Sequence, residues 1–153
     1  LLAAGLAQAQ LSIEITGAGA NRIPVTIVDF PGDPTASRVI TSTVRADLER
    51  SGLFKLIDHS NLAFDENAPI NHADWKARGA DGLAAGSISR SADGRMEARF
   101  RLYDTQKGVS LGGAAYVTNS TQLRAAGHRI ADYIYEKLTG EKGVFSTRIA
   151  YVV

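Results

Sequence analysis

The stretch of sequence that decides the fold is Ile23-Pro-Val-Thr-Ile-Val-Asp-Phe-Pro-Gly-Asp-Pro-Thr-Ala-Ser-Arg-Val-Ile-Thr-Ser-Thr-Val-Arg-Ala-Asp-Leu-Glu-Arg-Ser-Gly-Leu-Phe-Lys-Leu-Ile-Asp58. Its apolar, β-branched opening, up to Phe30, predicts a strand. Residues 35–51 carry apolar side chains at helical spacing and predict a helix, which Gly52 ends. Residues 53–58 predict a second strand, which completes a strand–helix–strand unit. The apolar stripe of the helix comprises Val39, Ile40, Val44 and Leu48.

Three further strands are predicted downstream, at residues 82–90, 95–104 and 109–119. The dipeptide Asp93-Gly94 is typical of a hairpin between the first two. Residues 95–104 alternate strictly between apolar and polar, which predicts one buried and one exposed face. The predicted buried residues are Met96, Ala98, Phe100 and Leu102, and the predicted exposed residues are Arg95, Glu97, Arg99, Arg101 and Tyr103.

Two more helices complete the predicted fold. A short helix capped by Asn71 follows a surface loop at 59–70 and contains Trp75. The last helix begins at Ser120 or Thr121 and ends at Gly140. Its apolar face comprises Leu123, Ala126, Gly127, Ile130, Ile134 and Leu138. The chain is therefore predicted to be an α/β protein, with one mixed sheet of five or six strands and two long helices packed on it.

The first residues predict processing and a further strand. The small residues of Ala7-Gln8-Ala9 are typical of a signal-peptidase site, which would make residues 1–9 a signal peptide remnant and 10–153 the mature domain. The start of an ordinary Ala-rich helix is the alternative. Residues 11–16 alternate apolar and polar and predict a half-buried strand, which residues 17–22 join flexibly to the rest.

Composition limits the classes of function. The 153 residues suffice for one domain with a real core, and the net charge of +1 gives no electrostatic case for binding nucleic acid or membranes. The absence of cysteine excludes disulfides, thiolate zinc sites, a cysteine nucleophile and a lipidated amino-terminal cysteine. No apolar segment is long enough to span a membrane. We therefore expect an exported protein that does not insert into membranes.

No residue set predicts catalysis, a cofactor or a metal. His59, His72 and His128 lack the spacing of metal ligands. Gly17-Ala-Gly19 lacks the third glycine and the following helix of a dinucleotide loop. Four aspartates lie near strand ends, where capping and turn formation explain them as well as catalysis does: Asp29, Asp33, Asp58 and Asp104. A basic row of Arg95, Arg99 and Arg101 is interrupted by Glu97 and is interpreted as a solvated sheet face.

Four landmarks together resemble the amino-terminal domain of the TolB family of the Tol-Pal envelope system. They are the strand at 11–16 behind the cleavage site, the motif Val44-Arg-Ala-Asp-Leu-Glu-Arg-Ser-Gly-Leu-Phe54, the motif Leu123-Arg-Ala-Ala-Gly-His128, and the ending Lys137-Leu-Thr-Gly-Glu-Lys-Gly-Val-Phe-Ser-Thr-Arg-Ile-Ala-Tyr-Val-Val153. The resemblance covers nearly all of residues 10–153. In that family, the strand predicted at Ile149–Val153 leads into a β-propeller, which is missing from this sequence.

The resemblance implies a non-catalytic periplasmic adaptor between the TolA–TolQ–TolR motor and the lipoprotein Pal, which supports envelope integrity and cell division. Pal binds the propeller, and the mature amino terminus engages the carboxy-terminal domain of TolA. The corresponding partner-binding residues are Gln10, Leu11, Ser12, Ile13, Glu14, Ile15 and Thr16.

Several alternatives remain open from the sequence. Residues 11–16 are either a detachable segment that pairs with a partner sheet or a permanent edge strand of this domain, and the resemblance favours the first. Two other functions are a component of an outer-membrane assembly or secretion system built on the same strand–helix–strand unit, and a small periplasmic enzyme that uses the strand-end aspartates.

Overall fold

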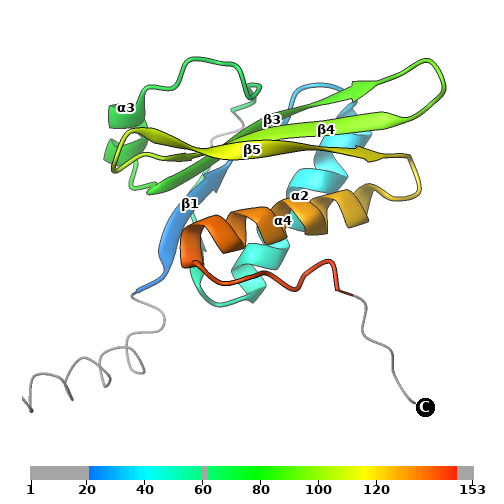
Figure 1. Cartoon of the computed structure of the whole chain (residues 1–153). Helices are drawn as coiled ribbons and strands as arrows, with labels where there is room; N and C mark the ends of the chain where they lie inside the picture. Colours follow the sequence, from blue (N-terminus) through cyan, green and yellow to red (C-terminus); the bar gives the residue numbers. More distant parts are fainter. Residues whose placement is uncertain (1–20, 60–61, 148–153) are drawn as a thin grey trace, which may run out of the picture.

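The computed structural model describes residues 21–59 and 62–147 (Figure 1). The signal peptide remnant 1–9, the predicted strand at Leu11–Thr16 and the predicted strand at Ile149–Val153 lie outside the described residues. The described elements are β1 (Ile23–Ile27), α2 (Pro34–Arg50), β2 (Phe54–Leu56), α3 (His72–Ala77), β3 (Gly82–Arg90), β4 (Met96–Asp104), β5 (Val109–Thr118) and α4 (Leu123–Thr139).

The described strands form one mixed sheet in the order β2-β1-β3-β4-β5. Strand β1 runs parallel to both β2 and β3, whereas β3, β4 and β5 form an antiparallel meander. The long helices α2 and α4 pack together on one face of this sheet (Figure 1). The predicted mixed sheet with two long helices is therefore confirmed, with five strands in the described part.

Helix α2 forms where its sequence predicts it. The Asp33 carboxylate caps the helix by accepting a hydrogen bond of 2.9 Å from the Ala36 amide, and Pro34 occupies the first turn. Its stripe faces the sheet, and burying it supplies much of the core. The fully buried side chains of this stripe are Ala36, Ile40, Val44 and Leu48.

Helix α4 differs from the prediction at its start. The helix begins at Leu123, with Gln122 at the N-cap and no side-chain capping bond. The helix starts two or three residues later than predicted, because Asn119 instead accepts hydrogen bonds from the Thr121 amide and hydroxyl. Gly140 ends the helix in the left-handed conformation at φ 81°, as predicted.

The apolar face of α4 is confirmed except at its last position. Ile130 and Ile134 are fully buried, whereas Leu138 is only half-buried and packs at the margin of the core, next to Gly82.

The opposite face of the sheet is covered at one end by α3 and the loop before it. Trp75 packs there with Val28, Leu83 and Ala85 in a second hydrophobic cluster. Tyr103 belongs to this cluster and is only 8% exposed. The prediction that Tyr103 is exposed is therefore wrong. Its ring does lie opposite the helices, as the alternation requires, but Trp75, Phe64 and their neighbours cover it.

Two strands are shorter than predicted. β1 ends at Ile27, because the chain beyond it forms only isolated bridges. Asp29 bridges to Ala63, and Gly32 bridges to Ile88. β2 spans only Phe54–Leu56. No helix among the described residues is both long and apolar enough to cross a membrane.

Candidate functional site

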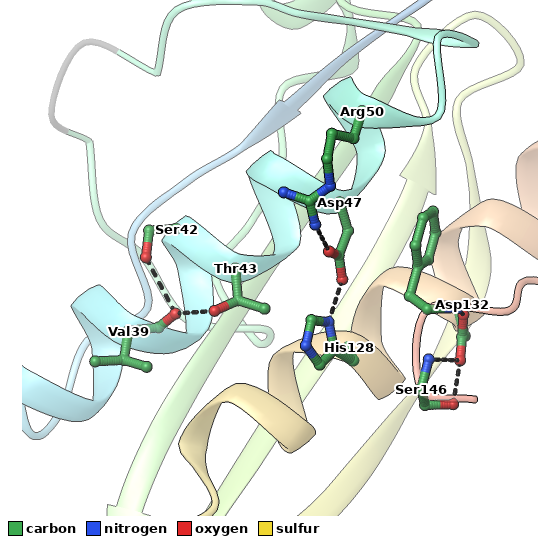
Figure 2. A network of polar contacts seen from close by, with 9 residues as sticks. Val39, Ser42, Thr43, Asp47, Arg50, His128, Asp132 and Ser146 are labelled. Carbon is green, nitrogen blue, oxygen red and sulfur yellow. Dashed lines mark hydrogen bonds and ion pairs between the residues drawn. The ribbon is translucent and has the colours of Figure 1, made fainter. Parts of the chain in front are cut away.

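The two motifs inside the described residues that carry the family resemblance meet between α2 and α4. Asp47 Oδ2 lies 2.5 Å from Nδ1 of His128, and the other oxygen of Asp47 accepts a hydrogen bond of 2.5 Å from Arg50 (Figure 2). The Asp47 side chain is 1% exposed, and that of His128 is 26% exposed. A buried carboxylate is therefore satisfied by one partner from each helix.

A close approach of the helix backbones makes this contact possible. A Cβ placed on Gly127 would lie 2.7 Å from Cβ of Thr43 and 3.1 Å from the carbonyl oxygen of Ile40. Only glycine fits there without displacing α2. The Thr43 hydroxyl donates to the Val39 carbonyl of its own helix at 2.7 Å, so its methyl group is left to face α4 (Figure 2).

The contact between Asp47 and His128 has a structural role. A hollow of about 230 Å³ beside it is lined by Ser42, Thr43, Ala46, Asp47, Arg50 and Arg124. Ser42 donates to the Val39 carbonyl at 3.1 Å, whereas a nucleophilic serine would be hydrogen-bonded to the histidine. We interpret the contact between Asp47 and His128 as a polar tie that fixes how the two helices pack.

The strand-end aspartates have separate structural roles. Asp29 forms an ion pair of 2.8 Å with Arg45, which also donates to the Ile27 carbonyl. Asp104 accepts a hydrogen bond from the Lys107 amide in the turn before β5. These contacts do not bring the aspartates to one catalytic centre.

Asp33 caps α2, and this role lowers the pKa of its carboxyl. The hydrogen bond from the Ala36 amide holds the pKa of its carboxyl below the ordinary value, and Arg90 acts in the same direction. Both effects stabilise the charged form of a capping residue.

The histidines do not converge. His72 lies edge-on against Tyr103, with 5.8 Å between ring centroids, and His128 is held by Asp47 on the opposite face of the sheet. Among the described residues, no group of three or more His, Cys, Asp or Glu side chains could hold a metal ion.

The predicted partner-binding residues Gln10 to Thr16 lie outside the described residues, so their placement is not part of this site. The described chain begins at Asn21, inside the predicted linker 17–22. The Ile23 amide donates to the Leu53 carbonyl at 2.8 Å, which fixes the start of β1 to the end of the α2–β2 turn.

A second polar cluster holds the chain that follows α4. Asp132 on α4 accepts hydrogen bonds from the amides of Phe145 and Ser146, at 2.7 and 3.1 Å, and from the Ser146 hydroxyl (Figure 2). The Phe145 ring packs edge-on against Tyr135. Residues 143–146 are therefore pinned along α4.

Sequence reasoning missed both Asp47 and Asp132 because each is a single polar residue beside an apolar stripe. For Asp47, one signal was available, since both partners lie in the motifs of the family. For Asp132, no local pattern distinguishes the residue from a solvated position.

The fold and these polar clusters define a small α/β sandwich domain, in which Asp47 joins α2 to α4 and Asp132 joins α4 to the chain that follows it. Residues 11–111 match the family model for the TolB amino-terminal domain. The chain is 88% identical to the Tol-Pal system protein TolB of Dechloromonas aromatica and 55% identical to that of Aromatoleum aromaticum. The alignments cover 98% and 100% of this chain and 35% and 37% of those proteins. This chain belongs to the TolB family, as its amino-terminal domain, and spans about a third of the length of these relatives.

A comparison with solved structures supports the same family assignment. The crystal structure of TolB from Acinetobacter baumannii matches with a TM-score of 0.69 and 35% identity, over 82% of this chain and 30% of that one. A PelC dodecamer from Paraburkholderia phytofirmans has a TM-score of 0.50 at 14% identity, over 77% of this chain and 90% of that one. The second likeness shows that this fold occurs outside the TolB family. The relatives are named as Tol-Pal system proteins, and neither their name nor that of the family model refers to an enzymatic activity.

Proposed function

We propose that this chain is a non-catalytic adaptor domain of the periplasm, which binds the carboxy-terminal domain of TolA through residues 10–16 and thereby supports envelope integrity and cell division. The family membership carries the proposal. The match to the TolB amino-terminal domain starts at residue 11, within the proposed binding segment.

The described residues between Ile23 and Phe145 form two hydrophobic clusters of their own. The segment Leu11–Thr16 carries alternating apolar residues, which suits strand addition to the sheet edge of a partner. Gly17 and Gly19 lower the cost of moving it relative to β1.

Binding to Pal is proposed to require the propeller of the longer family members. This chain alone should then bind TolA and not Pal. The two activities can therefore be separated by titrating each purified partner into the same protein.

The test is a titration of labelled TolA carboxy-terminal domain into the chain from Gln10 onward and into the chain from Gly17 onward. We expect binding only to the first, and nearly equal thermal unfolding of both, because the clustered core is retained. A matched pair of variants sharpens the result. Replacing Ile13 and Ile15 with Ser should abolish binding, whereas replacing Ser12 with Ala should leave it intact.

Two outcomes would count against the proposal. Equal binding by the shortened chain would place the TolA site elsewhere on the domain. Loss of folding in the shortened chain would mean that Leu11–Thr16 is a permanent strand of this sheet, the alternative that the sequence leaves open.

A further inference from the structure

Strand β5 forms one edge of the described sheet (Figure 1). The two halves of this strand differ in whether a further strand could pair with them. In the first half, the ladder with β4 is shifted at Leu102 and Tyr103, and the Tyr133 hydroxyl donates to the Leu111 carbonyl. These features block further strand pairing. In the second half, Gly113–Val117, no hydrogen bond beyond the ladder with β4 is formed to any described residue.

This open half also lacks the residues that usually protect a sheet edge. From Val109 to Thr118, the strand contains no charged residue and no proline. On the face opposite the helices, Gly113, Ala115 and Val117 are exposed, and Val117 is 59% exposed. The backbone groups along the outer side of this segment are therefore accessible to another strand.

The neighbouring strand supplies positive charge on the same face. The ladder places Arg101 opposite Gly113, and Arg99 opposite Ala115. Both arginines are exposed, and they line a hollow of about 270 Å³ together with Glu66, Asn67 and the backbone of β5. Arg99 is paired with Glu97 at 2.6 Å, whereas Arg101 has no ion pair with any described residue.

The small residues of β5 leave a clear path from these arginines to the sheet edge. An added strand would lie about 4.8 Å beyond β5, so its side chains would stand two strands away from β4. Gly113 has no side chain and Ala115 has only a methyl group, so nothing on β5 separates the guanidinium groups from that strand. Glu66, the carboxylate already in the hollow, accepts a hydrogen bond from Ser87 at 2.8 Å.

We propose that the outer edge of β5 from Gly113 to Val117 is a docking site for an extended acidic segment of a partner protein. The segment adds as a further strand and places carboxylates opposite Gly113 and Ala115, against Arg101 and Arg99. Opposite Val117 it carries an apolar residue, because Glu97 lies in that row and repels a further acid. Main-chain hydrogen bonds supply affinity, and the alternating side chains supply specificity.

Charge favours this occupant over a second copy of the chain. Two β5 edges paired with each other would place only glycine, alanine and valine side chains over the row, with little apolar area to bury. Such pairing would also leave Arg101 of both copies on one continuous sheet face without an acidic partner.

The probe is a fluorescein-labelled peptide, Thr-Val-Thr-Glu-Thr-Glu-Thr, with an amidated carboxyl end, titrated into the 153-residue chain at low salt. We expect saturable binding, and amide shifts in an NMR titration that centre on residues 113–117. Arg101→Ala should weaken binding about twofold to fivefold, as the loss of one exposed ion pair predicts. Arg38→Ala, at an exposed arginine on α2, is the matched control and should leave affinity unchanged.

Two altered peptides separate the sources of binding. N-methylation of alternate residues, which removes main-chain donors at constant charge, should abolish binding. Replacement of both Glu residues by Lys should also abolish it. Unchanged binding of either peptide, or of the Arg101→Ala protein, would overturn the proposal, as would amide shifts elsewhere or no binding at millimolar peptide.

Two further measurements identify other occupants. Sedimentation of the free protein should show a monomer, and a dimer broken by Ala115→Pro would assign the edge to a second copy instead. Binding that arises only when residues 10–16 are deleted would assign the edge to the chain's own amino terminus. Either result overturns the proposed partner.

Discussion

Asp47 on α2 and His128 on α4 lie 2.5 Å apart, and this contact joins two sequence motifs that are separated by most of the domain. The Asp47 carboxylate is buried, and Arg50 covers its other oxygen. A buried carboxylate that loses a partner keeps its desolvation cost, so the contact should matter more for stability than an exposed ion pair would.

His128→Ala should therefore lower the free energy of unfolding by about 1–3 kcal/mol, because it leaves one oxygen of a buried carboxylate without a partner. The measurement is urea denaturation at neutral pH. Glu49→Ala, at an exposed position on the same helix, is the control and should change stability by less than about 0.5 kcal/mol.

A double-mutant cycle with Asp47→Asn tests whether the two residues act as a unit. The double variant should lose less stability than the sum of the single variants, with a coupling of about 0.5–3 kcal/mol. Strict additivity would show that the contact contributes nothing and that the helices are held by apolar packing alone.

Gly127→Ala should destabilise the domain although alanine has the higher helix propensity. The propensity gain is about 1 kcal/mol, whereas the added methyl group would lie 2.7 Å from Cβ of Thr43 and force the helices apart. We expect a net loss of about 1–3 kcal/mol in thermal or chemical unfolding. Ala125→Ser, on the exposed side of α4, is the control. A Gly127→Ala protein that is more stable than the parent would mean that the interface between α2 and α4 can accommodate a methyl group.

Ile134 and Leu138 share one sequence pattern but not one environment. Ile134→Ala should cost about 2–5 kcal/mol because its side chain is fully buried. Leu138→Ala should cost clearly less, since this side chain lies half-exposed at the end of the core. Urea denaturation of both variants, with unchanged slopes, measures which one loses more free energy of unfolding. An equal loss in the two variants would show that the last turn of α4 is as well packed as its centre.

The difference between these two positions illustrates how far the sequence predicts this fold. Helical spacing predicted three of the fully buried positions of α2, Ile40, Val44 and Leu48. The fourth predicted position, Val39, is only partly buried, and the fully buried Ala36 was not predicted. The same spacing includes Leu138, but a period does not reveal where the opposing layer ends. Tyr103 shows the converse case. Alternation places it opposite the helices, and the nonperiodic residues 62–70 together with α3 bury it there.

The polar contacts were less predictable for a related reason. Asp47 follows Val44 by three positions and lies on the flank of α2 that faces α4, and only the three-dimensional pairing of two helices shows its partner. Ser120 and Thr121 are good capping residues by type, yet Asn119 binds Thr121 in a turn and delays the helix to Leu123. Residue preference identifies the region of a helix start, and competing side-chain bonds decide the position.

Asp33 should make the stability of α2 depend on pH in the acidic range. Its pKa is lowered in the folded protein, by the Ala36 amide and then by Arg90, so its charged form stabilises the fold. That contribution is complete above the ordinary pKa of 3.8 and is lost as the pH falls through the lower, folded pKa.

Asp33→Ala should be less stable than the parent at neutral pH, and the difference should shrink below about pH 4. Asp33→Asn, which can cap without titrating, should show a smaller deficit that lacks this pH dependence. A deficit of Asp33→Ala that stays constant down to pH 2 would mean that the charge of Asp33 contributes nothing.

Asp132 should control the chain that leaves α4. Its carboxylate accepts the amides of Phe145 and Ser146, and charge-assisted bonds of this kind contribute about 1.5–3 kcal/mol each where they are protected from water. Residues 143–147 make few other hydrogen bonds, so Asp132→Ala should release this segment while the packing of α4 on the sheet persists.

Native-state hydrogen exchange is the appropriate measurement, because it separates local from global opening. We expect much faster exchange of the Phe145 and Ser146 amides in Asp132→Ala, with Ile130 and Ile134 protected as before. Asp132→Asn, which keeps one acceptor oxygen, should give an intermediate rate. Unchanged exchange of the Phe145 amide would mean that the contact between its ring and Tyr135 holds the segment in place. The hydrogen bonds to Asp132 would then contribute nothing to its stability.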